Sequence, residues 1–332
     1  MKLSFQIYKF NLKETFAIAY GSYSFRNALI VTLSSNQQSG HGECTEINYY
    51  HINLQQYTTI LKSIKTKIEF QKVVHPTRFY EFLLSLHIPS FLQSALDCAY
   101  WDLYGKLEQK TFFEMNTIPI SQVPESSITI SCAPINEQIK KIENSSWNKF
   151  KVKCNGFDEK NITKLALLNQ NIALDANASF SISNCKRLEQ LEISKNFTYI
   201  EQPLEIGIEN FANLTINSKT NWMADEDIQG IENLQLLKIH YKSINIKLVK
   251  CGGLTPALQL INTAKKLNFK IMIGCMTEST IGISAASVLA PLCNYADLDG
   301  ANLIANDCAN GTKILNGKIE FSNQPGLGIE LL

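Results

Sequence analysis

The chain has 332 residues, of which 45% are hydrophobic, and its 31 basic residues almost balance its 30 acidic residues. That length allows one large core or a barrel with an added domain, and the balanced charge argues against nucleic acid or a membrane surface as a partner. No apolar run approaches the roughly 18 residues of a membrane span, and the nine cysteines lack the CxxC spacing of metal or redox motifs. We therefore expect a soluble, cytoplasmic protein with reduced thiols that binds a small molecule.

The first 125 residues predict an α+β domain. Short alternating or β-rich runs predict strands, and from about residue 56 to residue 107 the apolar spacing becomes helical. Gly105 follows the apolar face of the last helix, and we expect it to end that helix. The predicted strands lie at 3–7, 28–33 and 40–44.

From residue 126 onward, β-rich segments alternate with helical stretches about every 20–26 residues. Eight such segments with seven intervening helical stretches predict a (β/α)8-type barrel over residues 126–310. A doubly wound sheet is disfavoured because no Gly-rich phosphate turn follows a strand. Residues 311–332 predict a further strand and a Pro-Gly turn, which we expect to return to the N-terminal domain. The eight predicted strands are 128–134, 150–155, 172–177, 199–204, 221–226, 244–250, 270–278 and 295–300.

Carboxylates mark the ends of three consecutive strands of the predicted barrel. Asp175, Glu201 and Asp225 each follow an apolar segment, at the end of the barrel where active sites lie. A single Asp at such a junction is more often a helix N-cap. Three carboxylates in register instead favour a metal site, and hard oxygen ligands suit Mg²⁺ better than zinc.

Lysines within two apolar strands are candidate bases. Lys151 and Lys153 point to the same side of the second strand, and Lys247 comes from the sixth strand, across the barrel mouth. No histidine lies at a strand end, so we expect lysine to serve as the base, with its pKa lowered by neighbouring cations. Two bases on opposite sides of one carbon can remove a proton and return another to the other face. A solvated surface position fits Lys265 and Lys266 but not these three lysines.

The order and spacing of these motifs resemble the muconate-lactonizing subgroup of the enolase superfamily. The resemblance implies an α/β fold, with a modified TIM barrel under an N-terminal α+β capping domain. The motifs that carry it are Lys151-x-Lys153, Asp175-x-Asn177, Glu201-Gln202-Pro203, Ala224-Asp225-Glu226, Asn245-Ile246-Lys247, Lys250-x-Gly252-Gly253 and, ahead of the barrel, Asp97-x-Ala99, Asp102 and Gly105-Lys106.

The same resemblance implies roles for the charged residues. Asp175, Glu201 and Asp225 would bind one Mg²⁺ per subunit, for which Mn²⁺ can substitute. Lys153 and Lys247 would be the acid/base pair, and Lys151 would hold the substrate carboxylate. Removing a proton beside a carboxylate builds a dianion, which a divalent cation and lysines stabilise. A histidine-based racemase is disfavoured because the seventh strand has no histidine.

Asp297 and Asp299, at the end of the eighth strand, resemble the Asp-x-Asp pair of dipeptide epimerases, which receives the α-ammonium group of the substrate. Without an ammonium group the two carboxylates would remain unpaired in the pocket. N-Succinylamino acid racemases and o-succinylbenzoate synthases share the lysines and metal ligands but do not need this pair. They remain an alternative, and a non-catalytic binding protein on the same barrel is a less favoured one. We predict an isomerase, a dipeptide epimerase, whose partner is a small-molecule dipeptide.

Loops of the N-terminal domain, near 19–23 and 46–49, are expected by resemblance to cover the barrel mouth. In glutamate-selective dipeptide epimerases, an arginine in the first loop pairs with the distal carboxylate of the substrate. Alignment from Phe16 places Gly21 at that position, while Tyr20, Tyr23 and Tyr49 line an apolar pocket.

We therefore expect L-Ala-first dipeptides with a neutral or hydrophobic second residue, in preference to L-Ala-L-Glu. At the end of the seventh strand, Cys275, Thr277 and Glu278 are expected to contact the substrate. We also expect a homo-oligomer.

Overall fold

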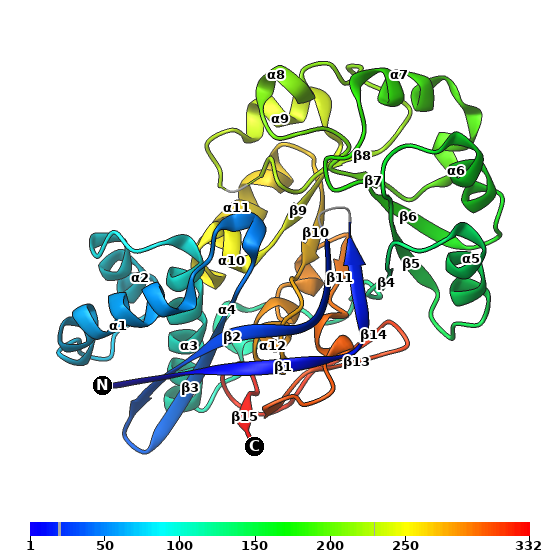
Figure 1. Cartoon of the computed structure of the whole chain (residues 1–332). Coiled ribbons are helices and arrows are strands. Elements are labelled where there is room, and N and C mark those ends of the chain that lie inside the picture. The colour runs from blue at the N-terminus through cyan, green and yellow to red at the C-terminus, as the bar shows by residue number, and fades with distance from the viewer. Residues whose placement is uncertain (19–20, 229) are drawn as a thin grey trace.

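An eight-stranded parallel sheet forms the centre of the chain, and its strands are neighbours in strict chain order (Figure 1). The computed structural model describes residues 1–18, 21–228 and 230–332. A parallel bridge between Ser126 and Ala296 joins the two edges of the sheet. The predicted (β/α)8-type barrel is therefore confirmed. Its strands are β4 (Ile128–Ile130), β5 (Lys149–Lys153), β6 (Asn171–Asp175), β7 (Ile200–Glu201), β8 (Trp222–Ala224), β9 (Ser243–Ile246), β10 (Lys270–Gly274) and β11 (Tyr295–Asp297).

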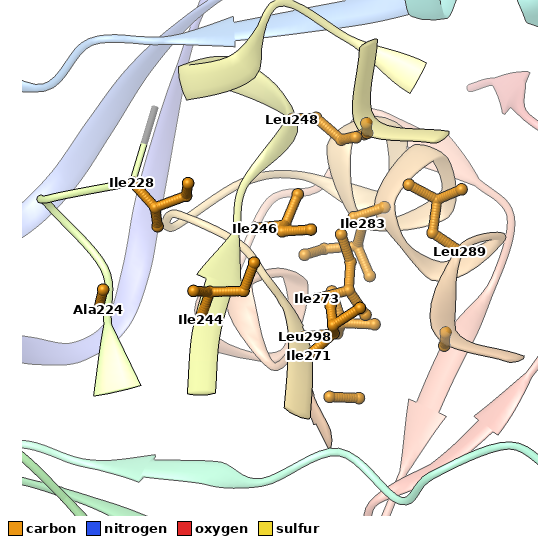
Figure 2. Close-up of a cluster of buried hydrophobic side chains, with 14 of the residues drawn as sticks. Ala224, Ile228, Ile244, Ile246, Leu248, Ile271, Ile273, Ile283, Leu289 and Leu298 are labelled. Carbon is orange, nitrogen blue, oxygen red and sulfur yellow. The ribbon is translucent and has the colours of Figure 1, made fainter. Parts of the chain in front are cut away.

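Helices cover the outside of the barrel, because alternate side chains of each strand point outward and are apolar. Figure 2 shows Ile244 and Ile246 of β9 gathered with Ile271 and Ile273 of β10 and with Ile283, all buried. Every connection between successive strands contains a helix. The barrel helices are α5 (Ile135–Glu143), α6 (Glu159–Ala166), α7 (Ile182–Gln190), α8 (Ile208–Phe211), α9 (Leu234–His240), α10 (Leu248–Cys251), α11 (Leu254–Lys266) and α12 (Thr280–Ser287), with 3-10 turns η2 (Glu192–Asn196), η3 (Ala290–Leu292) and η4 (Gly300–Leu303).

A separate apolar cluster fills the inside of the barrel. Ala173, Met223 and Met272 come from β6, β8 and β10, and Tyr199 directly precedes β7. All four are almost completely buried, with Tyr295 packed against them. This cluster forms a solid floor, as in other small barrels whose interior is filled by layers of side chains.

The N-terminal part combines an antiparallel sheet with helices, as predicted. Figure 1 shows the long β1–β2 hairpin reaching from the N-terminal helices toward the barrel. The end of β1 contacts the barrel directly, because the amide of Cys132, shortly after β4, donates to the carbonyl of Ala17. The elements are β1 (Lys2–Ile18), β2 (Gly21–Ser35), β3 (Gln38–Thr45), η1 (Asn48–Tyr50), α1 (Leu54–Glu69), α2 (Pro76–Ser85), α3 (Ser90–Glu108) and α4 (Phe112–Asn116).

Gly105 does not end its helix. Helix α3 continues to Glu108, and Gln109 adopts the left-handed conformation that terminates it. A Cβ atom on Gly105 would lie 2.5 Å from the Cα atom of Gly326. The glycine is therefore needed for the close approach of the C-terminal segment, a contact that local sequence does not reveal.

Helix α3 joins the N-terminal domain to the barrel through a buried carboxylate. Asp97 accepts hydrogen bonds from the amide and the hydroxyl of Thr255, both at 2.8 Å, and so caps the start of α11. Gly253 leaves space for this contact, since a Cβ atom there would lie 2.5 Å from the Asp97 carboxylate. The Asp97-x-Ala99 motif thus supplies a contact between the N-terminal domain and the barrel.

The last residues of the chain lie against the same helix. Asp102 accepts a hydrogen bond from the amide of Leu327 at 2.8 Å, and Lys106 donates to the carbonyl of Ile329 at 2.7 Å. Division of the chain after residues 125 and 310 remains a prediction. The segment contains β12 (Ala309–Asn310), β13 (Lys313–Leu315), β14 (Lys318–Glu320) and β15 (Glu330–Leu331).

Two findings concern the expected environment of the chain. Among the described residues, no helix combines the length and the apolar character needed to cross a membrane. All nine cysteines are free thiols in the structure.

His41 of β3, whose amide donates to Asp102 of α3, should make the stability of the fold depend on pH. It is 6% exposed, and burial, together with Lys106, lowers its pKa from 6.5 to about 4. The unfolded chain takes up a proton at the ordinary pKa while the folded chain does not, so stability is lost as pH falls from about 6.5 to 4. Between pH 7 and pH 5 the wild-type protein should therefore lose about 2 kcal/mol of unfolding free energy through His41. The His41→Gln variant should not show this part of the loss.

Urea unfolding of both proteins at the two pH values measures the difference. His87→Asn is the control, because His87 is exposed and should leave the pH dependence unchanged. An identical loss in wild type and His41→Gln would contradict the assignment.

Candidate active site

A layer of carboxylates lies directly above the apolar floor of the barrel. Asp175, Glu201 and Asp225 stand two residues after Ala173, Tyr199 and Met223 of the floor. Because side chains two residues apart share one face of a strand, all three carboxylates point into the barrel mouth. Each is at most 1% exposed. The structure brings together the three residues that the sequence selected as metal ligands.

Lys151 contacts several of these carboxylates. Its ammonium nitrogen pairs with Asp297, lies 3.6 Å from Asp175 Oδ2, and lies 3.4 Å from Glu201 Oε2. Burial opposes the charge of Lys151, but Asp297, Glu201 and Asp175 together raise its pKa well above the ordinary value. The lysine therefore balances the charge of a carboxylate cluster that burial alone would not tolerate.

The two candidate bases each pair with a different carboxylate. Lys153 Nζ lies 2.5 Å from Asp175 Oδ2, and Lys247 Nζ lies 2.7 Å from Asp225 Oδ2. Lys247 follows the last residue of β9 and caps α10. Although burial disfavours its charge, Asp225 raises the pKa of Lys247 well above its ordinary value. A base whose pKa is lowered by neighbouring cations, among them a bound divalent ion, stays a prediction. Sequence reasoning counted the neighbouring lysines but not these direct ion pairs.

Asp225 has a second lysine partner to which the sequence analysis gave no role. Lys250 Nζ lies 2.5 Å from Asp225 Oδ1 and also contacts the Asp225 carbonyl oxygen. Burial opposes ionisation, but Lys247 and Lys250 hold the pKa of Asp225 well below its usual range. The spacing of three residues between Lys247 and Lys250 across the start of α10 was the available signal.

A pocket opens above this layer, and most predicted site residues line it. From the barrel side, its walls include Lys151, Lys153 and Lys247, together with Cys275, Thr277, Asp297 and Asp299. The N-terminal domain supplies an apolar and aromatic roof. The roof residues are Phe16, Ile18, Tyr23, Arg26, Ile47, Tyr49 and Tyr50.

Three predicted substrate contacts are placed differently or lie outside the described chain. Glu278 is buried, but its carboxylate accepts from the amide of Met276 at 2.9 Å, and it is not part of the pocket wall among the described residues. Gly21 is exposed at the start of β2 and is likewise not part of that wall. Tyr20 lies outside the described residues.

Asp297 and Asp299 lie where the two edges of the barrel meet. Asp297 accepts from the hydroxyl of Ser127 at 2.7 Å, and Asp299 accepts from the amide of Thr129 at 2.7 Å. Burial and the neighbouring Asp297 raise the pKa of Asp299 to about 6. Two carboxylates this close and this buried favour the approach of a cation.

Arg26 lies in β2, and its side chain reaches the pocket. It is 8% exposed, its Nη1 donates to the carbonyl of Glu46 at 3.1 Å, and its guanidinium lies 4.1 Å from the centre of the Tyr23 ring. Burial lowers the pKa of Arg26, although Tyr23 and Glu46 oppose that shift. Arg26 thus joins the two roof segments.

The structure is a closed barrel with three carboxylates and three lysines at or near the carboxyl ends of its strands. This arrangement is typical of the class of enzyme barrel that the sequence motifs indicated. The chain matches the family described as Enolase C-terminal domain-like over residues 135–332. It is 35% identical to an L-Ala-D/L-amino acid epimerase of Maribacter sp. over 100% of this chain and 99% of that protein, and 35% identical to one of Flavobacterium johnsoniae, with 100% of both chains covered.

A crystal structure of a dipeptide epimerase from Methylococcus capsulatus, complexed with Mg and the dipeptide L-Arg-D-Lys, has a TM-score of 0.90 and 25% identity, and 99% of each chain is covered. The chain therefore belongs to the enolase superfamily, in the same family as these epimerases.

Proposed function

We propose that the protein is a dipeptide epimerase that moves the proton on the α-carbon of the C-terminal residue of a dipeptide. The observation that carries this proposal is that Lys153 and Lys247, from strands on different sides of the barrel, line one pocket. The names of the two relatives at 35% identity support the same reaction class. A homo-oligomeric state remains a prediction from the sequence.

The carboxylate layer fits a divalent cation. Ammonium groups contact all three carboxylates, and among the described residues no three acidic, cysteine or histidine side chains have an arrangement that would hold a metal ion as they stand. Glu201 Oε2, however, is buried and accepts no hydrogen bond from the described residues. An orphaned carboxylate oxygen beside two further carboxylates is a donor set that suits Mg²⁺. Asp175, Glu201 and Asp225 would hold the ion.

Bound Mg²⁺ would neutralise these three carboxylates, weaken their hold on Lys153 and Lys247, and stabilise the charge that develops on the substrate carboxylate. Lys153 and Lys247 would then exchange the α-proton from opposite faces, one accepting it while the other donates. Lys151, fixed among carboxylates, would hold the substrate carboxylate.

Asp297 and Asp299 support a dipeptide over an N-succinylamino acid as substrate. Both are buried in the pocket wall, and a free α-ammonium group would balance their charge. Asp297 already pairs with Lys151, but Asp299 has no ion-pair partner among the described residues, and the amide of an N-succinylated amino acid would bring it no cation.

The roof supports a neutral or hydrophobic second residue. Six of its side chains are aliphatic or aromatic, and the guanidinium of Arg26 already donates to a carbonyl and packs on Tyr23. Arg26 is nevertheless a cation in the pocket wall, so it is the residue that could favour L-Ala-L-Glu instead. The proposal keeps L-Ala-first dipeptides with neutral second residues as the preferred substrates.

Addition of Mg²⁺ should raise the thermal unfolding midpoint, because a ligand that binds the folded state stabilises it. Asp225→Asn should lose both this stabilisation and activity while it keeps the fold, which circular dichroism can check. NaCl at equal ionic strength is the control. Full turnover in excess EDTA would contradict a metal-dependent reaction.

Lys153→Ala and Lys247→Ala should each reduce epimerisation by about 10²–10⁴-fold or more, because each removes one of the two proton carriers. Each variant should still exchange the α-proton of one stereoisomer in D₂O, with Lys153 serving the L isomer, as mass spectrometry can show. The exposed Lys265→Ala is the matched control. Wild-type rates in either active-site variant would refute the two-base scheme.

L-Ala-L-Val, L-Ala-L-Met and L-Ala-L-Phe should exceed L-Ala-L-Glu in kcat/KM by about a hundredfold, since an unpaired glutamate side chain would be desolvated in the roof. Arg26→Met should not reverse this order. A preference for L-Ala-L-Glu that Arg26→Met abolishes would instead identify Arg26 as the receptor of the distal carboxylate.

A further inference from the structure

Among the described residues, the side chain of Asn245 makes one hydrogen bond, and that bond goes to a candidate metal ligand. Its Nδ2 donates to Glu201 Oε1 at 2.6 Å, and both side chains are fully buried. The two residues belong to β9 and β7, with β8 between them. The amide orientation follows from chemistry, because the nitrogen of an amide, and not its oxygen, can donate to a carboxylate.

Glu201 differs from the other two carboxylates in how its oxygens are held. Asp175 and Asp225 each pair with a lysine at 2.7 Å or less. The two oxygens of Glu201 are unequal: Oε1 accepts from Asn245, whereas Oε2 accepts no hydrogen bond from the described residues. The nearest ammonium nitrogen to Oε2 that forms an ion pair is Lys151, at 3.4 Å. Asn245 thus fixes one oxygen and leaves the other directed at the cluster.

Stability does not explain an amide at position 245. Asn245 Oδ1 is buried and has no hydrogen-bond partner among the described residues, and a buried carbonyl oxygen without a donor destabilises a fold. The neighbouring strand even leaves space for this oxygen, since a Cβ atom on Gly274 would lie 2.3 Å from it. A leucine of similar size would remove this unpaired oxygen, although it would also take away the donor to Glu201 Oε1. The benefit of the amide must therefore come from Glu201.

We propose that Asn245, given its space by Gly274, is a positioning residue that holds Glu201 so that only Oε2 remains to bind a divalent cation. An unrestrained Glu201 carboxylate could rotate, or offer both of its oxygens to Lys151. Residues that orient a metal ligand contribute substantially to affinity, and their loss commonly weakens metal binding 10–100-fold. The inference rests on the proposed metal site but not on the identity of the substrate.

Binding of Mn²⁺ in the absence of any dipeptide, followed by electron paramagnetic resonance of the free ion, tests this role. Asn245→Leu should raise the Kd for Mn²⁺ by about 10–100-fold. The thermal midpoint of the metal-free variant shows whether it folds, and a purely structural asparagine would change that midpoint and leave Kd unchanged. Either an unchanged Kd or wild-type protein that binds no Mn²⁺ overturns the inference.

Gly274→Ala tests the same role without changing Asn245. In the wild-type background the added methyl group should displace the Asn245 amide and raise the Kd for Mn²⁺. In the Asn245→Ala background it should raise Kd no further, because the atom it displaces is gone. Additive effects of the two substitutions would show that they act independently and would overturn the proposal.

Ser243→Ala is the matched control. Ser243 lies two residues earlier on β9, is fully buried, and donates to Asn221 Oδ1 at 2.7 Å, so its loss removes an equivalent bond without touching Glu201. Its Kd for Mn²⁺ should equal that of wild type; an increase as large as that of Asn245→Leu would overturn the inference. A wild-type protein that binds Mn²⁺ but epimerises no dipeptide would refute the proposed function and leave the role of Asn245 intact.

Discussion

The buried layer of charge above the barrel floor is the constraint on which the rest of the structure depends. Three carboxylates at most 1% exposed cannot be tolerated in an apolar interior unless cations compensate them. The barrel supplies these cations from the same layer, as Lys151, Lys153 and Lys247 and from the next helix as Lys250. Because these lysines come from β5 and from the region where β9 passes into α10, the strands must be in correct register for the charges to balance. The charge balance of the site and the closure of the barrel therefore both require the same register of the strands.

The apolar floor and the outer helices support this buried layer of charge. The floor residues place apolar packing directly beneath the carboxylates. The outward side chains, such as Ile244 and Ile246 in Figure 2, bind the helices that hold the strands in place. Alternation of side chains along a strand separates the two tasks, since inward positions carry charge or floor and outward positions carry the core.

That alternation explains which parts of the molecule the sequence could predict. The eight strands and the charged strand ends were accessible because they depend on local period and on the spacing of motifs. Contacts between distant segments were not. Gly105 was interpreted as a helix stop because its neighbour Gly326 lies more than two hundred residues away in the chain. The direct pairing of lysines with Asp225 and Asp297 could not be predicted because it depends on side-chain rotamers. Glu278 is not part of the pocket wall among the described residues, and its carboxylate turns back to the amide of Met276.

The attachment of the C-terminal segment to α3 has a consequence for synthesis of the chain. Asp102 is completely buried, yet one of its hydrogen bonds comes from Leu327, 225 residues later. Lys106, which also balances Asp102, uses the carbonyl of Ile329. Until residues 327 and 329 have been synthesised and have left the ribosome, α3 lacks these partners. The N-terminal domain is therefore made first but reaches its final packing only after the barrel sequence has been synthesised.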